Sequence, residues 1–218
     1  MYYLSAFSVL LPLFAGIILF RKLDLNSCVV VLLAFFASVA QIASYLLRKE
    51  DVWKYFNIYT VVDAVLWAFI FFRSSRLRVI RTIIFIVISL QVITTVLLFV
   101  KNGIQGRFYY EFVCLNSLLE TLWVLSYFYE YYTGESIGPL ERQPLFWFCL
   151  GILNYSPTTY FLFVFYEKIK VDQTPEYANL WSLHGFINAC MYFIFLIGIV
   201  VNAKQTSKSM YVFGKHQS

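Results

Sequence analysis

Three ionisable side chains lie inside apolar stretches of the sequence, well away from the ends of those stretches: Asp63, Glu120 and His184. An ionisable group within a membrane costs at least about 2.5–3.5 kcal/mol on insertion scales, and such groups usually face the interior of a helix bundle. Carboxylates and an imidazole are suited to ligand contacts, to proton transfer and, taken together, to zinc coordination. These three residues are therefore the first candidates for function.

Each of the three shares a helix face with aromatic or amide side chains, because residues three or four apart lie on the same face of a helix. The neighbours at this spacing are Tyr59 and Trp67 for Asp63, Asn116 and Trp123 for Glu120, and Trp181 and Asn188 for His184. Such mixed polar and aromatic stripes predict inward-facing surfaces on three separate helices.

The elements that carry these stripes follow from composition. The 218 residues are 61% hydrophobic and only 13% charged, whereas soluble domains are about a quarter charged. The apolar residues fall in seven runs of a length that crosses a hydrocarbon core about 30 Å thick. The runs cover about 3–20, 28–47, 56–72, 79–100, 108–132, 145–166 and 178–201. The sequence predicts an all-α polytopic membrane protein: one seven-helix bundle over residues 1–201, followed by a short basic cytoplasmic tail at 202–218.

Lysine and arginine in the loops predict the orientation, because cytoplasmic loops carry an excess of both. With the N-terminus outside, the inner segments hold ten of these residues and the outer segments seven. We therefore expect the N-terminus outside and the C-terminus in the cytoplasm. The net charge of +5 is explained by basic edges that face anionic membrane lipid, so no nucleic acid is expected as a partner.

This orientation places the polar residues at similar depths. Asp63, Asn116 and His184 lie about seven residues from the outer ends of their helices, hence about 10 Å deep, and Glu120 lies at about 16 Å. The segment NYSPTTY of the sixth run reaches the same level. We predict a ligand-binding pocket in the outer half of the bundle, formed by Asp63, Asn116, Glu120, Tyr155, His184 and Asn188 with Trp67, Trp123 and Trp181.

Pro157 lies within the sixth run. Proline inside a helix removes one backbone hydrogen bond and frees the carbonyl four residues earlier, here that of Leu153. We therefore predict a kink at Pro157, which either shapes the pocket or only bends the helix.

Other roles for these side chains stay open. His184 either contacts a ligand or joins two helices by a hydrogen bond, and the carboxyl groups of Asp63 and Glu120 pair with each other, with His184 or with a ligand. A zinc site of these three residues would lack the HxxxH pair of seven-helix zinc hydrolases, because Asn188 stands at the second position. A single intramembrane histidine and four cysteines without CxxC spacing lead us to expect no metal and no cofactor.

Three short motifs in the C-terminal half carry a resemblance. Pro144 precedes Phe146 and Trp147, the segment GILNYS covers 151–156, and Leu183-His184 is followed by Asn188. In these motifs the chain resembles a family of small, uncharacterised bacterial seven-helix membrane proteins, often encoded beside two-component histidine kinases. The resemblance implies a multi-pass protein of the bacterial inner membrane with a signalling role and a histidine kinase or another membrane signalling protein as partner. It carries over no catalytic residues.

The leading hypothesis is a non-enzymatic sensor or receptor-like module that binds a small or lipid-like ligand in the outer pocket. Three alternatives remain. An intramembrane lipid hydrolase would use His184 with Asp63 and Glu120, a proton-coupled carrier would use the carboxyl groups to move protons, and a structural subunit would use the polar residues only to join helices.

Overall fold

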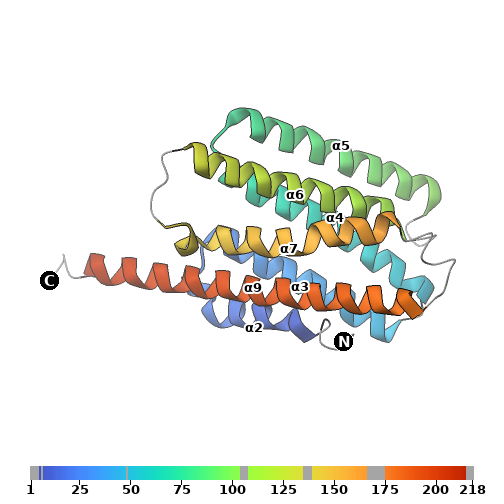
Figure 1. The fold of residues 1–218 in the computed structure, drawn as a ribbon, viewed down its shortest axis with the longest axis horizontal. Coiled ribbons are helices and arrows are strands. Elements are labelled where there is room, and N and C mark those ends of the chain that lie inside the picture. Colours follow the sequence, from blue (N-terminus) through green and yellow to red (C-terminus); the bar gives the residue numbers. More distant parts are fainter. Residues whose placement is uncertain are drawn as a thin grey trace.

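The computed structural model describes residues 5, 7–47, 49–103, 108–134, 139–165 and 175–214. These residues form seven α-helices and two short 3-10 turns, and no strand occurs among them. The α-helices are α2 (Leu10–Leu19), α3 (Leu25–Leu46), α4 (Lys49–Ser74), α5 (Arg78–Asn102), α6 (Tyr110–Thr133), α7 (Pro144–Val164) and α9 (Pro175–Gly214). Figure 1 shows them running roughly side by side along the long axis of the molecule. The all-α prediction is confirmed.

Five of the helices are long and apolar enough to cross a membrane: α3, α4, α5, α6 and α9. Helix α7 has 21 residues but carries the polar segment NYSPTTY, and α2 has only 10 described residues. By length and composition, the chain is a polytopic helical membrane protein. The side of the membrane on which each end lies stays a prediction.

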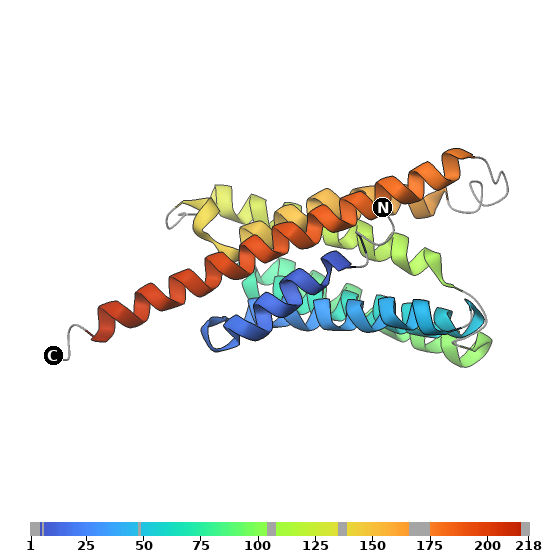
Figure 2. The ribbon, with the colours of Figure 1, turned by 90° about the horizontal axis from the view of Figure 1, so that it is seen from below.

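The last helix continues past the end of the seventh predicted run, and the division into bundle and tail stays a prediction. Helix α9 is 40 residues long and continues to Gly214, through most of the segment expected to be a tail. Figure 2 shows its C-terminal part extending past the ends of the other helices. The polar residues after 201 favoured a tail because they end the apolar run, but they contain no proline or glycine before Gly214 that would end a helix. Residues 215–218 lie outside the described part.

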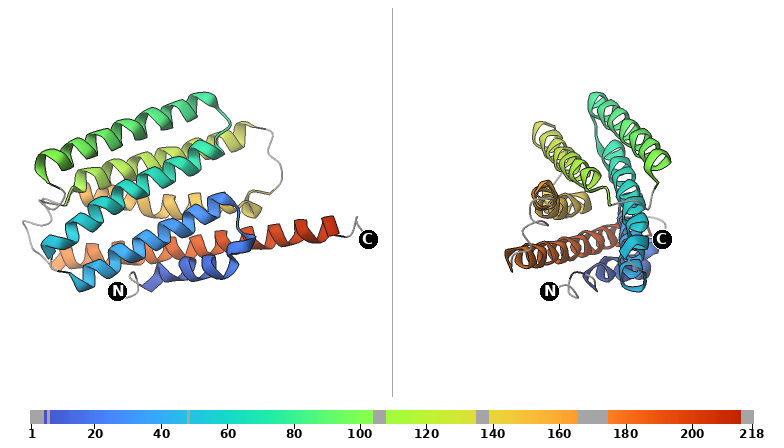
Figure 3. Two further views of the ribbon diagram at one scale, coloured as in Figure 1. Left: turned by 180° about the vertical axis from the view of Figure 1, so that it is seen from behind. Right: turned by 90° about the vertical axis from the view of Figure 1, so that its right-hand side faces the viewer.

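Six of the helices form a closed ring, which the end-on view in Figure 3 shows. Going round it, neighbouring pairs are α6 with α7, α7 with α9, α9 with α2, α2 with α3, α3 with α4, and α4 with α6. Helix α5 lies outside the ring and packs on α4. A ring of helices leaves a central space that side chains must fill or line.

The outward faces of the helices carry large apolar side chains. On α5 alone, Val79, Phe85, Leu97 and Val100 are at least 62% exposed. A soluble protein rarely exposes so extended an apolar surface. Lipid chains cover such a surface at little cost, because the backbone polar groups in the middle of a helix are paired along the helix itself.

Two glycines allow α7 and α9 to pack closely. A Cβ atom on Gly151 of α7 would lie 2.5 Å from the ring of Phe195 of α9, and a Cβ on Gly198 of α9 would lie 2.5 Å from the ring of Phe148 of α7. The two rings are themselves packed edge to face, with centroids 5.9 Å apart. Small residues that admit the partner helix are typical of membrane helix pairs.

The end of the bundle that contains Arg21, Arg73, Arg76 and Arg142, here called the basic end, is held by polar contacts. Asp24 caps α3 by accepting a hydrogen bond from the Ser27 amide at 2.9 Å, and its own amide donates to Asn202 of α9 at 2.9 Å. Buried Glu130 of α6 accepts hydrogen bonds from the Ser75 hydroxyl and from the Arg76 amide at 2.6 Å. The basic loop between α4 and α5 is therefore fixed to α6.

Candidate functional site

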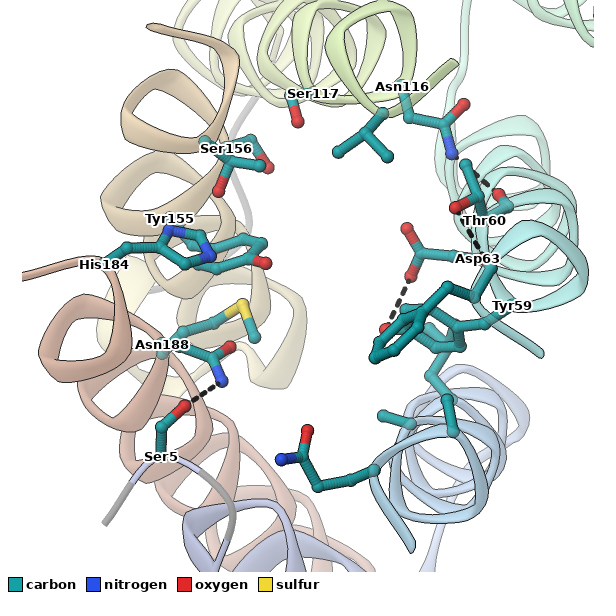
Figure 4. A pocket seen from close by; sticks show the side chains of 18 of the residues that line it. Ser5, Tyr59, Thr60, Asp63, Asn116, Ser117, Tyr155, Ser156, His184 and Asn188 are labelled. Atoms are coloured by element: carbon teal, nitrogen blue, oxygen red, sulfur yellow. Dashed lines mark hydrogen bonds between the residues drawn. The ribbon is translucent and has the colours of Figure 1, made fainter. Parts of the chain in front are cut away.

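A cavity of about 610 Å³ lies inside the ring, in the half of the bundle away from the basic end. Its lining comes from α3, α4, α6, α7 and α9, with Ser5 and Phe108 at its edge. Figure 4 shows polar side chains from several helices pointing into one open space. A volume of this size lies in the range of small-molecule sites, about 300–1,000 Å³.

Packed aromatic side chains close the cavity toward the basic end. Trp67 and Phe195 form its floor, with ring centroids 5.7 Å apart, and each is less than 5% exposed. Beneath them lie Phe71, Trp123 and Phe148 in the buried core. At the opposite end a row of rings crosses the wall, with successive centroids 5.3, 5.7 and 5.7 Å apart. This row consists of Trp53, Phe108, Phe163 and Trp181.

The two carboxyl groups meet beside the cavity. Asp63 of α4 and Glu120 of α6 lie within hydrogen-bonding reach of each other. The Tyr59 hydroxyl donates to Asp63 at 3.5 Å, and the Ser156 hydroxyl donates to Glu120 Oε2 at 2.5 Å. Glu120 is 5% exposed, and its Oε1 atom is buried without a hydrogen-bond partner. Since two ionised carboxylates have no donor between them, this contact requires a proton or another positive charge.

His184 lies on a different wall from the carboxyl groups, against the rings of α7 and α9. Figure 4 shows it beside Tyr155, across the open space from Asp63. Its ring centroid is 5.2 Å from that of Tyr155 and 5.8 Å from that of Trp181. The Nδ1 atom is buried without a hydrogen-bond partner. Pairing of His184 with Asp63 or Glu120, one of the alternatives that the sequence leaves open, does not occur in this structure, because the imidazole packs against Tyr155 and Trp181 instead.

Asn116 of α6 connects three helices at the cavity wall. Its side chain accepts a hydrogen bond from Gln91 of α5 and donates one to the Thr60 carbonyl of α4 at 2.8 Å. Gln91 and Asn116 are both buried. These contacts attach α5, which lies outside the ring, to the ring itself.

We expect Asn116→Leu to destabilise the bundle, because it leaves the amide of Gln91 without its acceptor. Polar contacts between membrane helices are worth about 0.6 to 1.7 kcal/mol. The double variant Gln91→Leu/Asn116→Leu should recover most of the loss, since replacing both partners by apolar groups is nearly neutral. Unfolding titrations of the two single variants and the double variant measure the coupling. Strictly additive losses would contradict a direct contact.

Eight of the nine predicted pocket residues line the cavity: Asp63, Asn116, Glu120, Tyr155, His184, Asn188, Trp67 and Trp181. Asn188 also donates to the Ser5 hydroxyl at 2.8 Å. Trp123 is not among the lining residues. It lies below the floor, 5% exposed, against Phe71. Helical spacing placed it on the face of Glu120, but it lies nearly one turn closer to the basic end, where the core is filled.

The sequence reasoning missed several lining residues. Tyr192 and Phe195 continue the stripe of His184 and Asn188 along α9, and the same helical spacing would have found them. Gln41 and Ser5 had no comparable signal, because each lies near the end of an apolar run. The kink at Pro157 stays a prediction, and this proline lies inside α7 next to Ser156.

The positions of these side chains do not favour the hydrolase or the zinc alternative. Within the described residues, no three His, Cys, Asp or Glu side chains lie close enough together to hold a metal ion, because His184 is on a different wall from Asp63 and Glu120. The Ser156 hydroxyl, a candidate nucleophile, hydrogen-bonds to Glu120 rather than to His184. No serine–histidine pair is therefore formed with this serine.

Fold and cavity together define a helical membrane protein with an internal, partly polar cavity. Comparisons with protein-family models, with curated proteins and with solved structures return no match. The resemblance to the bacterial seven-helix family stays a prediction, and the function has to be argued from the cavity.

Proposed function

We propose that this protein is a membrane sensor or receptor-like module that binds a small or lipid-like ligand in the cavity. The observation that carries the proposal is the cavity itself, about 610 Å³, open to polar side chains of several helices and closed by packed aromatic rings at one end. Because the cavity is closed at one end, a ligand would enter and leave it through the other end.

A route for the signal is part of the proposal. Ser156, which precedes Pro157, donates to Glu120 on α6. Ten residues further along α6, about 15 Å at 1.5 Å per residue, Glu130 holds the basic loop at Arg76. A ligand that moves α7 at Pro157 would shift α6 and, through Glu130, the basic loop. A ligand shifts the equilibrium between two arrangements of these helices only if it binds one arrangement more tightly than the other.

The remaining features of the proposal follow from the predicted orientation and the resemblance. The cavity opens toward the outer surface of a bacterial inner membrane, and the basic loop faces the cytoplasm. The partner is a histidine kinase or another membrane signalling protein that contacts this loop. Membrane lipid is the second class of partner.

Filling the cavity tests the binding half of the proposal. Ala37 on α3 lines the cavity, whereas Val39, two residues on and 39% exposed, faces outward. We expect Ala37→Trp to abolish saturable binding of amphipathic molecules from a lipid and small-molecule panel, and Val39→Trp to leave it unchanged. Native mass spectrometry of protein released from lipid nanodiscs measures bound species. Equal binding by both variants, or none by the wild type, would contradict the proposal.

Crosslinking in membranes tests the signalling half. Arg76→Cys in the basic loop, with a bifunctional thiol reagent, should capture a membrane or cytoplasmic protein whose yield changes when ligand is added. A proton-coupled carrier would instead show pH-dependent uptake that disappears in Asp63→Asn. Uptake of that kind in proteoliposomes would replace the receptor proposal.

A further inference from the structure

The cavity combines negative groups with aromatic walls and lacks basic side chains. Asp63 and Glu120 line the cavity, and none of the other described residues that line it is Lys or Arg. A ligand with a phosphate or carboxylate headgroup would face two carboxyl groups and no counter-charge. Charge alone therefore disfavours anionic ligands in this half of the cavity.

The contact between the two carboxyl groups has no hydrogen-bond donor when both are ionised. Glu120 Oε1 is buried and unpartnered, and Glu120 reaches Asp63 across the cavity wall. The donors that are present are Tyr59 and Trp67 on Asp63 and Ser156 on Glu120 Oε2, so none of them is directed at Glu120 Oε1. A group that brings both positive charge and N–H donors would satisfy what the protein leaves open.

Aromatic side chains surround the same region. Tyr59, Tyr155, Tyr192 and Trp67 all line the same cavity as the two carboxyl groups. Aromatic faces attract organic cations, at about 0.5–2 kcal/mol for each contact. Further out, the row of Trp53, Phe108, Phe163 and Trp181 gives an apolar wall. One end of the cavity thus suits an ammonium group and the other an apolar body.

We propose, on the basis of the binding function proposed above, that the natural ligand is an amphipathic amine. Its protonated nitrogen contacts the Asp63–Glu120 pair and supplies the positive charge that two ionised carboxyl groups in contact require, and its apolar part lies along the row of aromatic rings. Primary, secondary and tertiary ammonium groups carry the required N–H donor. A quaternary ammonium has no such donor and binds more weakly.

Three probes of equal shape test this ligand class: 4-phenylbutylamine, 4-phenylbutanol and 4-phenylbutyrate. Binding is measured by calorimetry with protein in lipid nanodiscs, and empty nanodiscs give the background of partitioning. We expect the amine to bind at least about tenfold more tightly than the alcohol, which is about 1.4 kcal/mol, and the carboxylate to bind most weakly. N,N,N-Trimethyl-4-phenylbutylammonium should fall between the amine and the alcohol.

Conservative variants show which groups are responsible. Asp63→Asn and Glu120→Gln should each weaken amine binding at least about tenfold and change alcohol binding by a much smaller factor. Ala37→Trp, which fills the cavity, should abolish both. Equal affinities of wild type for amine and alcohol, or unchanged amine binding in Asp63→Asn, would overturn the amine proposal. In that case the alcohol could still bind to wild type and not to Ala37→Trp, and the proposed binding function would remain. If Ala37→Trp changed the binding of none of the probes, both the amine proposal and the proposed binding function would be overturned.

Discussion

Gly198→Ala is expected to destabilise the bundle by about 1–3 kcal/mol, the usual cost of adding an atom to a filled core. The new methyl group would lie 2.5 Å from the ring of Phe148. That ring is fully buried and packed edge to face on Phe195, so it has no free space to move into. Helix α9 must instead move away from α7, which also disturbs the floor of the cavity.

Gly185→Ala on the same helix is the matched control. Among the described residues its methyl group would meet Ser5 alone, with Cβ at 3.5 Å and Oγ at 3.9 Å, which are ordinary contacts. Because alanine favours the helix over glycine by about 1 kcal/mol, this variant should be equally stable or more stable. Unfolding titrations of both proteins in detergent micelles compare the two. A Gly198→Ala protein as stable as Gly185→Ala would show that the α7–α9 contact tolerates a methyl group.

A substitution at Phe148, the partner of Gly198 in this contact, gives an independent check. Phe148→Leu shortens the side chain that Gly198 admits, so adding it to Gly198→Ala should restore part of the lost stability. A double variant less stable than the sum of the two single changes would contradict the proposed clash.

The helices could be predicted from the sequence because hydrophobic length is a direct consequence of membrane thickness. The cavity could be predicted in outline for a related reason. Asp63, Glu120 and His184 are costly inside a membrane, and helical spacing and rise placed them at similar depth on facing helices. Neither the cost of a charge in the membrane nor the spacing of residues along a helix depends on how the helices pack.

Packing decided what the sequence could not show. Trp67 and Trp123 each follow a carboxyl residue on the same helix face, yet only Trp67 reaches the cavity, because Trp123 lies about one turn deeper, at the level that Phe71 and Phe148 fill. His184 and Asp63 share a depth, but the order of helices round the ring sets them on different walls (Figure 4). Which helices lie next to each other depends on how their side chains fit together, as Gly198 and Phe148 do. A single sequence does not reveal that fit.

Glu120→Gln is expected to raise the stability of the ligand-free protein by about 1–3 kcal/mol, the cost of a buried polar group without a partner. The amide group of glutamine can donate to Asp63, while its oxygen still accepts from Ser156. The wild-type carboxyl group can donate to Asp63 only when it carries a proton, and its Oε1 atom has no hydrogen-bond partner. A residue that weakens the empty protein in this way is best explained by a binding role, since binding sites often reduce stability.

Glu130→Gln is the informative comparison, because Glu130 lies on the same helix and is also buried. It accepts two hydrogen bonds, from the Ser75 hydroxyl and from the Arg76 amide. Glutamine there would place an NH₂ group against one of these donors, so stability should fall. The two substitutions make the same chemical change with opposite expected signs, and thermal unfolding of both variants in nanodiscs measures them. A loss of stability in Glu120→Gln would mean that the carboxyl pair serves to hold α4 and α6 together, as in the structural-subunit alternative.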